Sequence, residues 1–133
     1  MKKKSIIFIS ILALIAIIIL FMFFSSRKMT DIYLKDYKIS NSNILTINVG
    51  VAGSMGYTKK IKTKNENNKL YITFYSTNGL NSKNGAKDTF DIQINENVDE
   101  IYFYRGSKEY VKVLSKKDWQ NKWKDLIKVI WKK

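Results

Sequence analysis

An apolar run of 19 residues lies almost at the start of the chain, from Ile6 to Phe24, and only Ser10 interrupts it. As an α-helix rising about 1.5 Å per residue, the run would span roughly 28 Å, close to the thickness of the hydrocarbon core of a bilayer. A helix that is apolar on every side must be surrounded by lipid or by a large protein core. The remainder of this chain of 133 residues is too short to supply such a core. The run therefore predicts a transmembrane helix over residues 6–24.

The flanking residues indicate whether this run is a cleaved signal peptide or a retained anchor. Three lysines precede it in "MKKKS", as in a signal peptide, but the run exceeds the usual signal core of about 7–15 residues. Its end, "FMFFSSRK", has bulky Phe where a signal peptidase requires small residues, and the absence of Cys excludes lipoprotein processing. We expect a retained, single-pass signal anchor in the cell membrane. Residues 1–5 would be cytoplasmic, residues 25–31 would form a polar stem, and the following domain would be extracytoplasmic.

Segments of alternating apolar and polar residues follow the stem, separated by turn-forming residues. The clearest are "ILTINVGV", "KLYITFYS" and "TFDIQI", and the strands "EIYFY" and "YVKVL" are joined by "RGSK", a connection typical of a hairpin. No helical pattern alternates with these strands, which argues against a parallel βαβ sheet. We predict a mainly β domain over residues 32–114. It would be an antiparallel immunoglobulin-like β-sandwich of about seven strands, with a small barrel as the alternative.

The end of the chain changes to helical periodicity. In "SKKDWQNKWKDLIKVIWKK", Ser115 and Asp118 have the spacing of a capping box, which begins a helix. We predict a basic, amphipathic helix over residues 115–133 whose apolar arc contains Trp119, Trp123, Leu126, Ile127, Ile130 and Trp131. These six residues are candidates for contact with the membrane interface. The same arc would also suit docking on the protein's own domain, or a partner helix in the same membrane.

The net charge of +13 is concentrated at the two ends of the chain. Residues 1–28 carry five basic and no acidic residues, residues 116–133 carry seven and two, and the body between them carries twelve and nine. The basic residues are 22 lysines and only two arginines, whereas recognition of bases and phosphates favours arginine. We therefore expect no nucleic-acid partner. The membrane bilayer, an anionic envelope polymer or a membrane protein fits the pattern better.

Most catalytic and metal sites are excluded because the chain lacks the side chains that they require. It has no His and no Cys, which removes the imidazole base, the thiolate nucleophile and thiolate metal ligands. Ser54 in "AGSMG" lacks the spacing of a nucleophile elbow, and the acids of "NENVDE" lack the glycine of a calcium loop. We predict a protein that is not an enzyme and that needs no metal or cofactor.

A long polar segment joins two predicted strands between Tyr75 and Thr89. Its Asn, Gly, Ser and Lys residues suit a crossover from one sheet to another, which we favour, although long loops on rigid sandwiches also carry binding sites. In the second interpretation the loop and the next hairpin would bind an anionic ligand through Asn78, Asn81, Lys83, Lys87 and Arg105.

Two strings, "LYITFYSTNGLNSKNGAKDTF" and "IYFYRG", resemble those of a group of small exported or membrane-anchored β-sandwich proteins of Gram-positive bacteria. The resemblance covers roughly Gly53 to Leu114. It implies an extracytoplasmic domain and a shared loop geometry, but no activity, cofactor or catalytic residue. The Trp-rich tail departs from the usual ending of that group.

These observations favour a non-enzymatic binding or interaction module that is tethered to the cell envelope. Its target would be an anionic wall or lipid surface or a membrane protein. The alternative is a small membrane-associated protective protein, such as a bacteriocin immunity factor, which would occupy a membrane target through its span and its tail helix.

Overall fold

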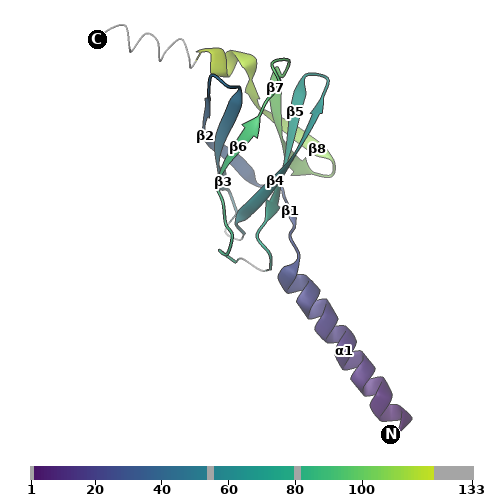
Figure 1. The fold of residues 1–133 in the computed structure, drawn as a ribbon. Coiled ribbons are helices and arrows are strands. Elements are labelled where there is room, and N and C mark those ends of the chain that lie inside the picture. Colours follow the sequence, from purple (N-terminus) through teal and green to yellow (C-terminus); the bar gives the residue numbers. More distant parts are fainter. Residues whose placement is uncertain (1, 54–55, 80–81, 122–133) are drawn as a thin grey trace.

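The computed structural model describes residues 2–53, 56–79 and 82–121 (Figure 1). A long helix leads into a β domain, and a short helical segment over residues 116–121 follows the last strand. The elements are α1 (Lys3–Phe24), β1 (Lys28–Met29), β2 (Ile32–Ile39), β3 (Ile44–Val51), β4 (Thr58–Glu66), β5 (Lys69–Ser76), β6 (Thr89–Gln93), β7 (Glu100–Gly106) and β8 (Glu109–Ser115).

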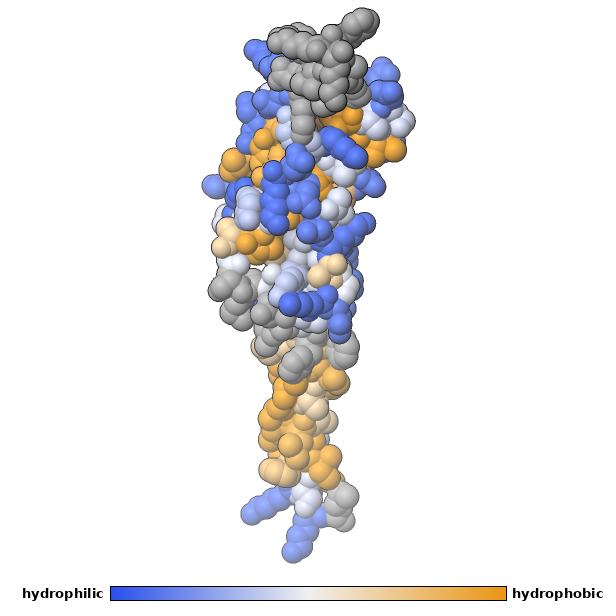
Figure 2. Space-filling view, turned by 90° about the vertical axis from the view of Figure 1, so that its left-hand side faces the viewer, coloured by the Kyte–Doolittle hydropathy of each residue, from blue (hydrophilic) through white to orange (hydrophobic). Residues whose placement is uncertain are grey.

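The helix α1 exposes apolar side chains on every side. Its large apolar residues between Ile6 and Met22 are 47–74 % exposed, and such an extended apolar surface suits contact with lipid. Figure 2 shows them as a continuous hydrophobic rod that projects from a domain with many hydrophilic residues on its surface. The hydroxyl of Ser10 donates a hydrogen bond of 2.9 Å to the carbonyl of Ile6, so it needs no water. Residues Lys3–Met22 are long and apolar enough to cross a membrane.

In the described part of the chain, eight strands form two sheets that pack face to face. The five-stranded sheet places β4, β5, β7 and β8 side by side, and β1 pairs with the last residues of β5. The three-stranded sheet has the order β2-β3-β6. The mainly β fold predicted from the alternating segments is confirmed, whereas the immunoglobulin-like topology stays a prediction.

The core lies between the two sheets, and it contains the residues that the alternation placed inward. Phe74 of β5 occupies its centre, with its ring centroid 6.0 Å from that of Phe90 on the opposite sheet and 4.7 Å from that of Phe103 on β7. All three rings are buried, and burying such a side chain contributes roughly 1.5–3 kcal/mol. Buried aliphatic residues surround them: Ile32, Leu45, Ile47, Val49, Leu70, Ile72, Ile92, Ile101 and Leu114.

The polar segment between β5 and β6 crosses from the five-stranded to the three-stranded sheet, as favoured from its length and composition. The chain then returns, and β7 lies beside β5 in parallel, with Lys69 opposite Glu100 and Ile72 opposite Phe103. The sandwich was predicted to be antiparallel, and among the described strands β5 and β7 form the one parallel pair. The reason is topological: β6 occupies the other sheet, so β5 and β7 run in the same direction in theirs.

The segment predicted as a stem is partly a strand. Met29 is buried and pairs with Phe74, so the sandwich begins at β1 rather than at residue 32. Ser26 donates a 2.7 Å hydrogen bond to the carbonyl of Ser76, and the backbone of Arg27 exchanges hydrogen bonds with Ser76. These contacts join the end of α1 directly to the end of β5.

The helical residues 116–121 lie at the end of the sandwich opposite to α1 (Figure 1). The carboxylate of Asp118 accepts hydrogen bonds from the backbone N–H of Ser115 (2.6 Å) and from its hydroxyl (2.9 Å), which supports the predicted cap. These donors lower the pKa of Asp118. Trp119 is only 7 % exposed and packs into the core, so this part of the helix closes the far end of the sandwich.

Candidate functional site

The described residues of the predicted loop site make separate contacts. Lys83 and Lys87 are exposed, but their ammonium groups lie over different rings: 5.8 Å from the centre of Tyr57 and 5.5 Å from that of Phe90. Asn78 is also exposed, and Asn81 lies outside the described residues. The two lysines thus contact different aromatic rings, and a binding role for this loop stays a prediction.

Arg105 does not join this group. It belongs to β7, and its guanidinium donates a hydrogen bond of 3.3 Å to the carbonyl of Tyr104. Its neighbour Gly106 lies against Thr30, close to β1, because a Cβ at that glycine would be 3.3 Å from the Thr30 methyl. In the five-stranded sheet, β5 separates β7 from β4.

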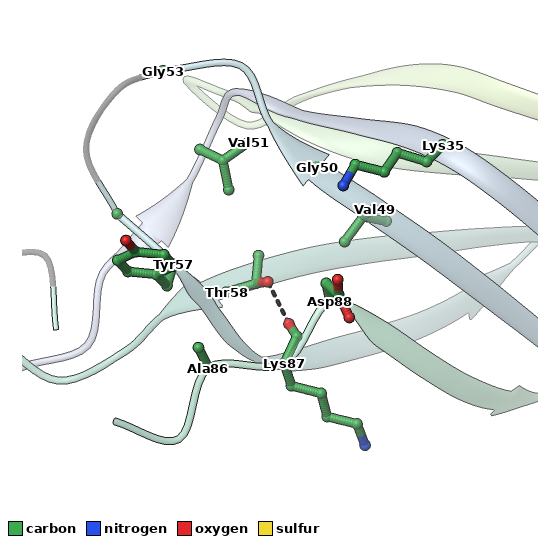
Figure 3. Close-up of a pocket in the computed structure, with 11 residues that line it drawn as sticks. Lys35, Val49, Gly50, Val51, Gly53, Tyr57, Thr58, Ala86, Lys87 and Asp88 are labelled. Atoms are coloured by element: carbon green, nitrogen blue, oxygen red, sulfur yellow. Dashed lines mark hydrogen bonds between the residues drawn. The ribbon is translucent and has the colours of Figure 1, made fainter. Parts of the chain in front are cut away.

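A cavity of about 480 Å³ lies between the start of β4, the end of β3 and the end of the crossover (Figure 3). Two hydrogen bonds within the chain join residues of its lining. The hydroxyl of Thr58 donates to the carbonyl of Lys87, and the carbonyl of Asp88 accepts a 2.9 Å hydrogen bond from the backbone of Val49. Figure 3 shows the Lys87 side chain leading away from the other lining residues. We therefore assign the cavity to the packing of the crossover.

A second surface has a stronger chemical character. Because side chains alternate along a strand, the strand registers place one set of residues on the outer face of the five-stranded sheet. We call this set the tyrosine–lysine face: Lys28, Lys60, Lys62, Lys64, Glu66, Lys69, Tyr71, Thr73, Tyr75, Glu100, Tyr102, Tyr104, Tyr110 and Lys112. It holds five of the eight tyrosines of the protein and six lysines against two glutamates. Among the described residues, the ring contacts outside the core all lie on this face rather than on the outer face of the other sheet.

The tyrosine rings pack against one another across the strands. Tyr71 and Tyr102 stack with their centroids 5.2 Å apart, and Tyr110 meets Tyr71 edge-on at 5.0 Å. Tyr104 meets Tyr110 in the same way at 5.5 Å. All of these rings are partly exposed, so their packing forms a preordered platform without hiding it from solvent.

Lysine ammonium groups lie over these rings. Both Lys60 and Lys62 approach Tyr75, at 5.5 and 5.6 Å from its centre. Lys28 lies 5.6 Å from the centre of Tyr104, and Lys69 lies 5.6 Å from that of Tyr102. Contacts of this length are attractive, and they hold the long side chains over the sheet.

The two acids of the face are held by its own residues. Glu100 accepts a 2.7 Å hydrogen bond from the Tyr102 hydroxyl, and its oxygens lie 3.5 Å from the Lys112 ammonium and 3.8 Å from that of Lys69. The hydrogen bond, and then the two ammonium groups, lower the pKa of Glu100, and the same hydrogen bond raises the pKa of Tyr102. Glu66 lies 3.0 Å from Lys64, which raises the pKa of that lysine. The face therefore presents an excess of cations.

Sequence reasoning missed this face although its parts were visible. Tyrosine recurs four positions apart in "YITFY" and two apart in "YFY", and lysine recurs at alternate positions in "KIKTK". The alternation predicted that Tyr71 and Tyr75 share the outward side of their strand. It did not indicate which strands are neighbours, and the platform depends on the parallel pairing of β5 with β7.

The predicted membrane-interface residues of the tail divide into two groups. Trp119 is buried against its own domain, which corresponds to the docking alternative and leaves its indole inaccessible to a bilayer in this structure. The other five, Trp123, Leu126, Ile127, Ile130 and Trp131, lie outside the described residues.

No protein-family model, curated protein or solved structure matches this chain. The features of this chain that bear on function are therefore the tyrosine–lysine face and the apolar helix α1.

Proposed function

We propose that this protein is a non-enzymatic binding module, anchored in the cell membrane by α1, whose tyrosine–lysine face binds an anionic polymer of the cell envelope. The observation that carries the proposal is the gathering of five tyrosines and six lysines on one accessible sheet face. The basic start of the chain followed directly by an apolar run supports an extracytoplasmic domain.

The spacing of the charges favours a polymer over a small ligand. Lys60, Lys62 and Lys64 occupy alternate positions of β4, so their Cα atoms are roughly 6–7 Å apart along the strand. This row lies at the edge of the sheet, where a long chain can pass without obstruction. A repeating anion can contact several ammonium groups in turn, and each contact displaces counterions.

The tyrosines supply a second kind of contact. A tyrosine ring offers a large, rigid and partly apolar surface at a low cost in side-chain entropy. Such a ring can lie against the apolar faces of the units that separate the anionic groups of a polymer. Charge alone would bind any polyanion, whereas charge together with a ring platform selects polymers whose backbone can lie flat.

The test uses the full-length protein in micelles of a neutral detergent. Labelled poly(glycerol phosphate) and polygalacturonate serve as anionic polymers, dextran as the neutral polymer and a single-stranded oligonucleotide as the competing class. We expect binding to at least one anionic polymer, none to dextran, and a steep loss of affinity as salt is added.

A matched pair of triple variants locates the site. Replacing Lys60, Lys62 and Lys64 by Gln should weaken binding about tenfold or more and flatten its salt dependence. The control replaces Lys35, Lys38 and Lys117 by Gln, which removes the same charge from other surfaces and should leave the affinity nearly unchanged. Equal weakening by both variants, or a preference for the oligonucleotide over every anionic polymer, would contradict the proposal.

A further inference from the structure

A second basic surface lies at the end of the sandwich that adjoins α1. The connection between helix and sheet is short and hydrogen-bonded: the carbonyl of Ser25 accepts from Gly79 of the crossover (3.3 Å), and Ser26 donates to Ser76. The crossover is therefore held beside the point where α1 leaves the hydrocarbon layer (Figure 1). Any bilayer that α1 spans places its headgroups next to this end of the domain.

Three cations gather there. Arg27 follows the last residue of α1 by three positions and is exposed. Lys83 lies on the crossover, with its ammonium over Tyr57. Lys59 approaches the same loop, since its Cε is 3.6 Å from the position that a Cβ would take at Gly85. We call Arg27, Lys59 and Lys83 the membrane-proximal collar.

A β-bulge separates Lys59 from the tyrosine–lysine face. The register of β4 with β5 shifts between Thr58 and Lys60, and Lys59 is the extra residue. A bulge redirects a side chain away from the regular alternation, and here it directs Lys59 toward the crossover while Lys60 stays over Tyr75. In the sequence "TKKIK", the neighbouring residues Lys59 and Lys60 thus belong to two different surfaces.

From this arrangement we infer that the membrane-proximal collar binds the anionic phospholipid headgroups of the bilayer that α1 spans. Two observations select lipid as the occupant: the collar is continuous with the transmembrane helix, and its cations are complementary to a negatively charged surface. Tyr57 under Lys83 repeats the pairing of aromatic and basic residues that is common at membrane interfaces. Of the nearby acids, Asp31 is occupied by the backbone N–H of Gly53 (3.0 Å), and Asp88 stands at the cavity behind the crossover.

Headgroup contact would orient the domain. With the crossover against the membrane, the opposite end of the sandwich, closed by Trp119, points away from the bilayer (Figure 1). The tyrosine–lysine face would then be roughly perpendicular to the membrane plane and accessible to an envelope polymer. The collar inference itself does not depend on the polymer proposal, because its ligand is the bilayer.

Because the chain has no cysteine, single labels test the inference cleanly. The full-length variants Asn84→Cys, next to the collar, and Asn67→Cys, in the far turn between β4 and β5, each receive a fluorescent label. They are reconstituted into vesicles of phosphatidylcholine alone or with about 30 % phosphatidylglycerol, with a quencher on the lipid headgroups. We expect quenching at position 84 that is at least twofold stronger in the anionic vesicles, and little quenching at position 67 in either.

Removing the charges of the collar distinguishes two explanations of the quenching: binding of anionic headgroups by the collar, and simple proximity of the label to α1. Replacing the three collar residues by Gln should abolish the extra quenching in anionic vesicles. The matched control, Lys60, Lys62 and Lys64 to Gln, removes the same charge from the tyrosine–lysine face and should leave the quenching intact. The inference is overturned if position 84 responds equally in the two lipids, or if its response follows the ratio of protein to lipid, which would indicate contact with a second copy.

Discussion

The two outer faces of the sandwich cover the same core but differ in chemistry. On the three-stranded sheet, short polar side chains satisfy one another: Thr46 donates to Asp91 at 2.6 Å, and Asn48 donates to Thr89 at 2.9 Å. On the five-stranded sheet, long lysines lie over a platform of tyrosines whose rings pack together. On the first face the polar groups are paired with one another or exposed to water. The second face leaves aromatic surface and excess positive charge available to a partner.

The exposed tyrosines of the two sheets have different neighbours, and the neighbours indicate whether a ring fills a packing gap or belongs to a binding surface. The three-stranded sheet also exposes a tyrosine, Tyr33, but this ring lies over Gly50 on the neighbouring strand and fills the space of its absent side chain. The tyrosines of the other face contact each other and the lysines, and none of them lies against a glycine in the described part of the chain. Tyrosine thus fills a packing gap on the three-stranded sheet and forms a platform of contacting rings on the five-stranded sheet.

The largest expected effect comes from the core that both faces share. Phe74→Ala would remove a buried ring that contacts both Phe90 and Phe103. We expect a loss of about 3–5 kcal/mol in the free energy of unfolding. Denaturant unfolding followed by circular dichroism would measure it. Because one core supports both sheets, tyrosine fluorescence and circular dichroism should report the same transition, and two separate transitions would contradict this view.

The next effect distinguishes the two kinds of tyrosine. Tyr71→Ala should weaken binding of the anionic polymer about three- to tenfold, or roughly 0.7–1.4 kcal/mol, because Tyr71 stacks on Tyr102 at the centre of the platform. Tyr71→Phe should retain most of the affinity, since the ring face remains. Tyr33→Ala on the other sheet is the matched control and should bind as the wild type does. Equal loss in both alanine variants, measured by titration with labelled polymer, would remove the distinction.

An effect of similar size, on stability rather than on binding, is expected at Gly50 itself. A Cβ at this position would lie 2.5 Å from Cζ of Tyr33 and 2.8 Å from Cε of Lys35, so Gly50→Ala must displace the ring. We expect a cost of about 1 kcal/mol in wild-type background. In a Tyr33→Ala background the same substitution should be neutral or stabilising, because glycine is unfavourable within a strand. A double-mutant cycle with no coupling between the two positions would show that the ring does not cover the glycine.

Local pattern predicted much of this fold, and pairing explains what it did not. The alternation of Leu70, Ile72 and Phe74 with tyrosines identified a strand and its buried side, and all three apolar residues are buried. The two-residue strand β1 was missed because two residues show no periodicity. Which strands become neighbours depends on the crossover, and this long-range choice brings Tyr71 beside Tyr102. The binding loop was inferred from composition alone, and composition does not indicate which side chains converge.

The smallest expected effect concerns the acid within the platform. The Tyr102 hydroxyl, and then the ammonium groups of Lys112 and Lys69, lower the pKa of Glu100 below its ordinary value of 4.5. A carboxyl whose pKa is lower in the folded than in the unfolded protein stabilises the fold above the unfolded pKa. That contribution disappears as the pH falls through the folded pKa. Between about pH 5 and pH 3 the melting temperature of wild type should therefore fall more steeply than that of Glu100→Gln.

Tyr102→Phe identifies the cause of this pH dependence. It removes the hydroxyl that donates to Glu100 at 2.7 Å but keeps the ring in the platform. Its melting temperature should therefore depend on pH less than that of wild type and more than that of Glu100→Gln, because the two lysines still act on the carboxylate. If Tyr102→Phe and wild type show the same pH dependence, the lysines rather than the tyrosine hold the acid. The carboxylate would then be held by the two ion pairs and not by the tyrosine hydroxyl.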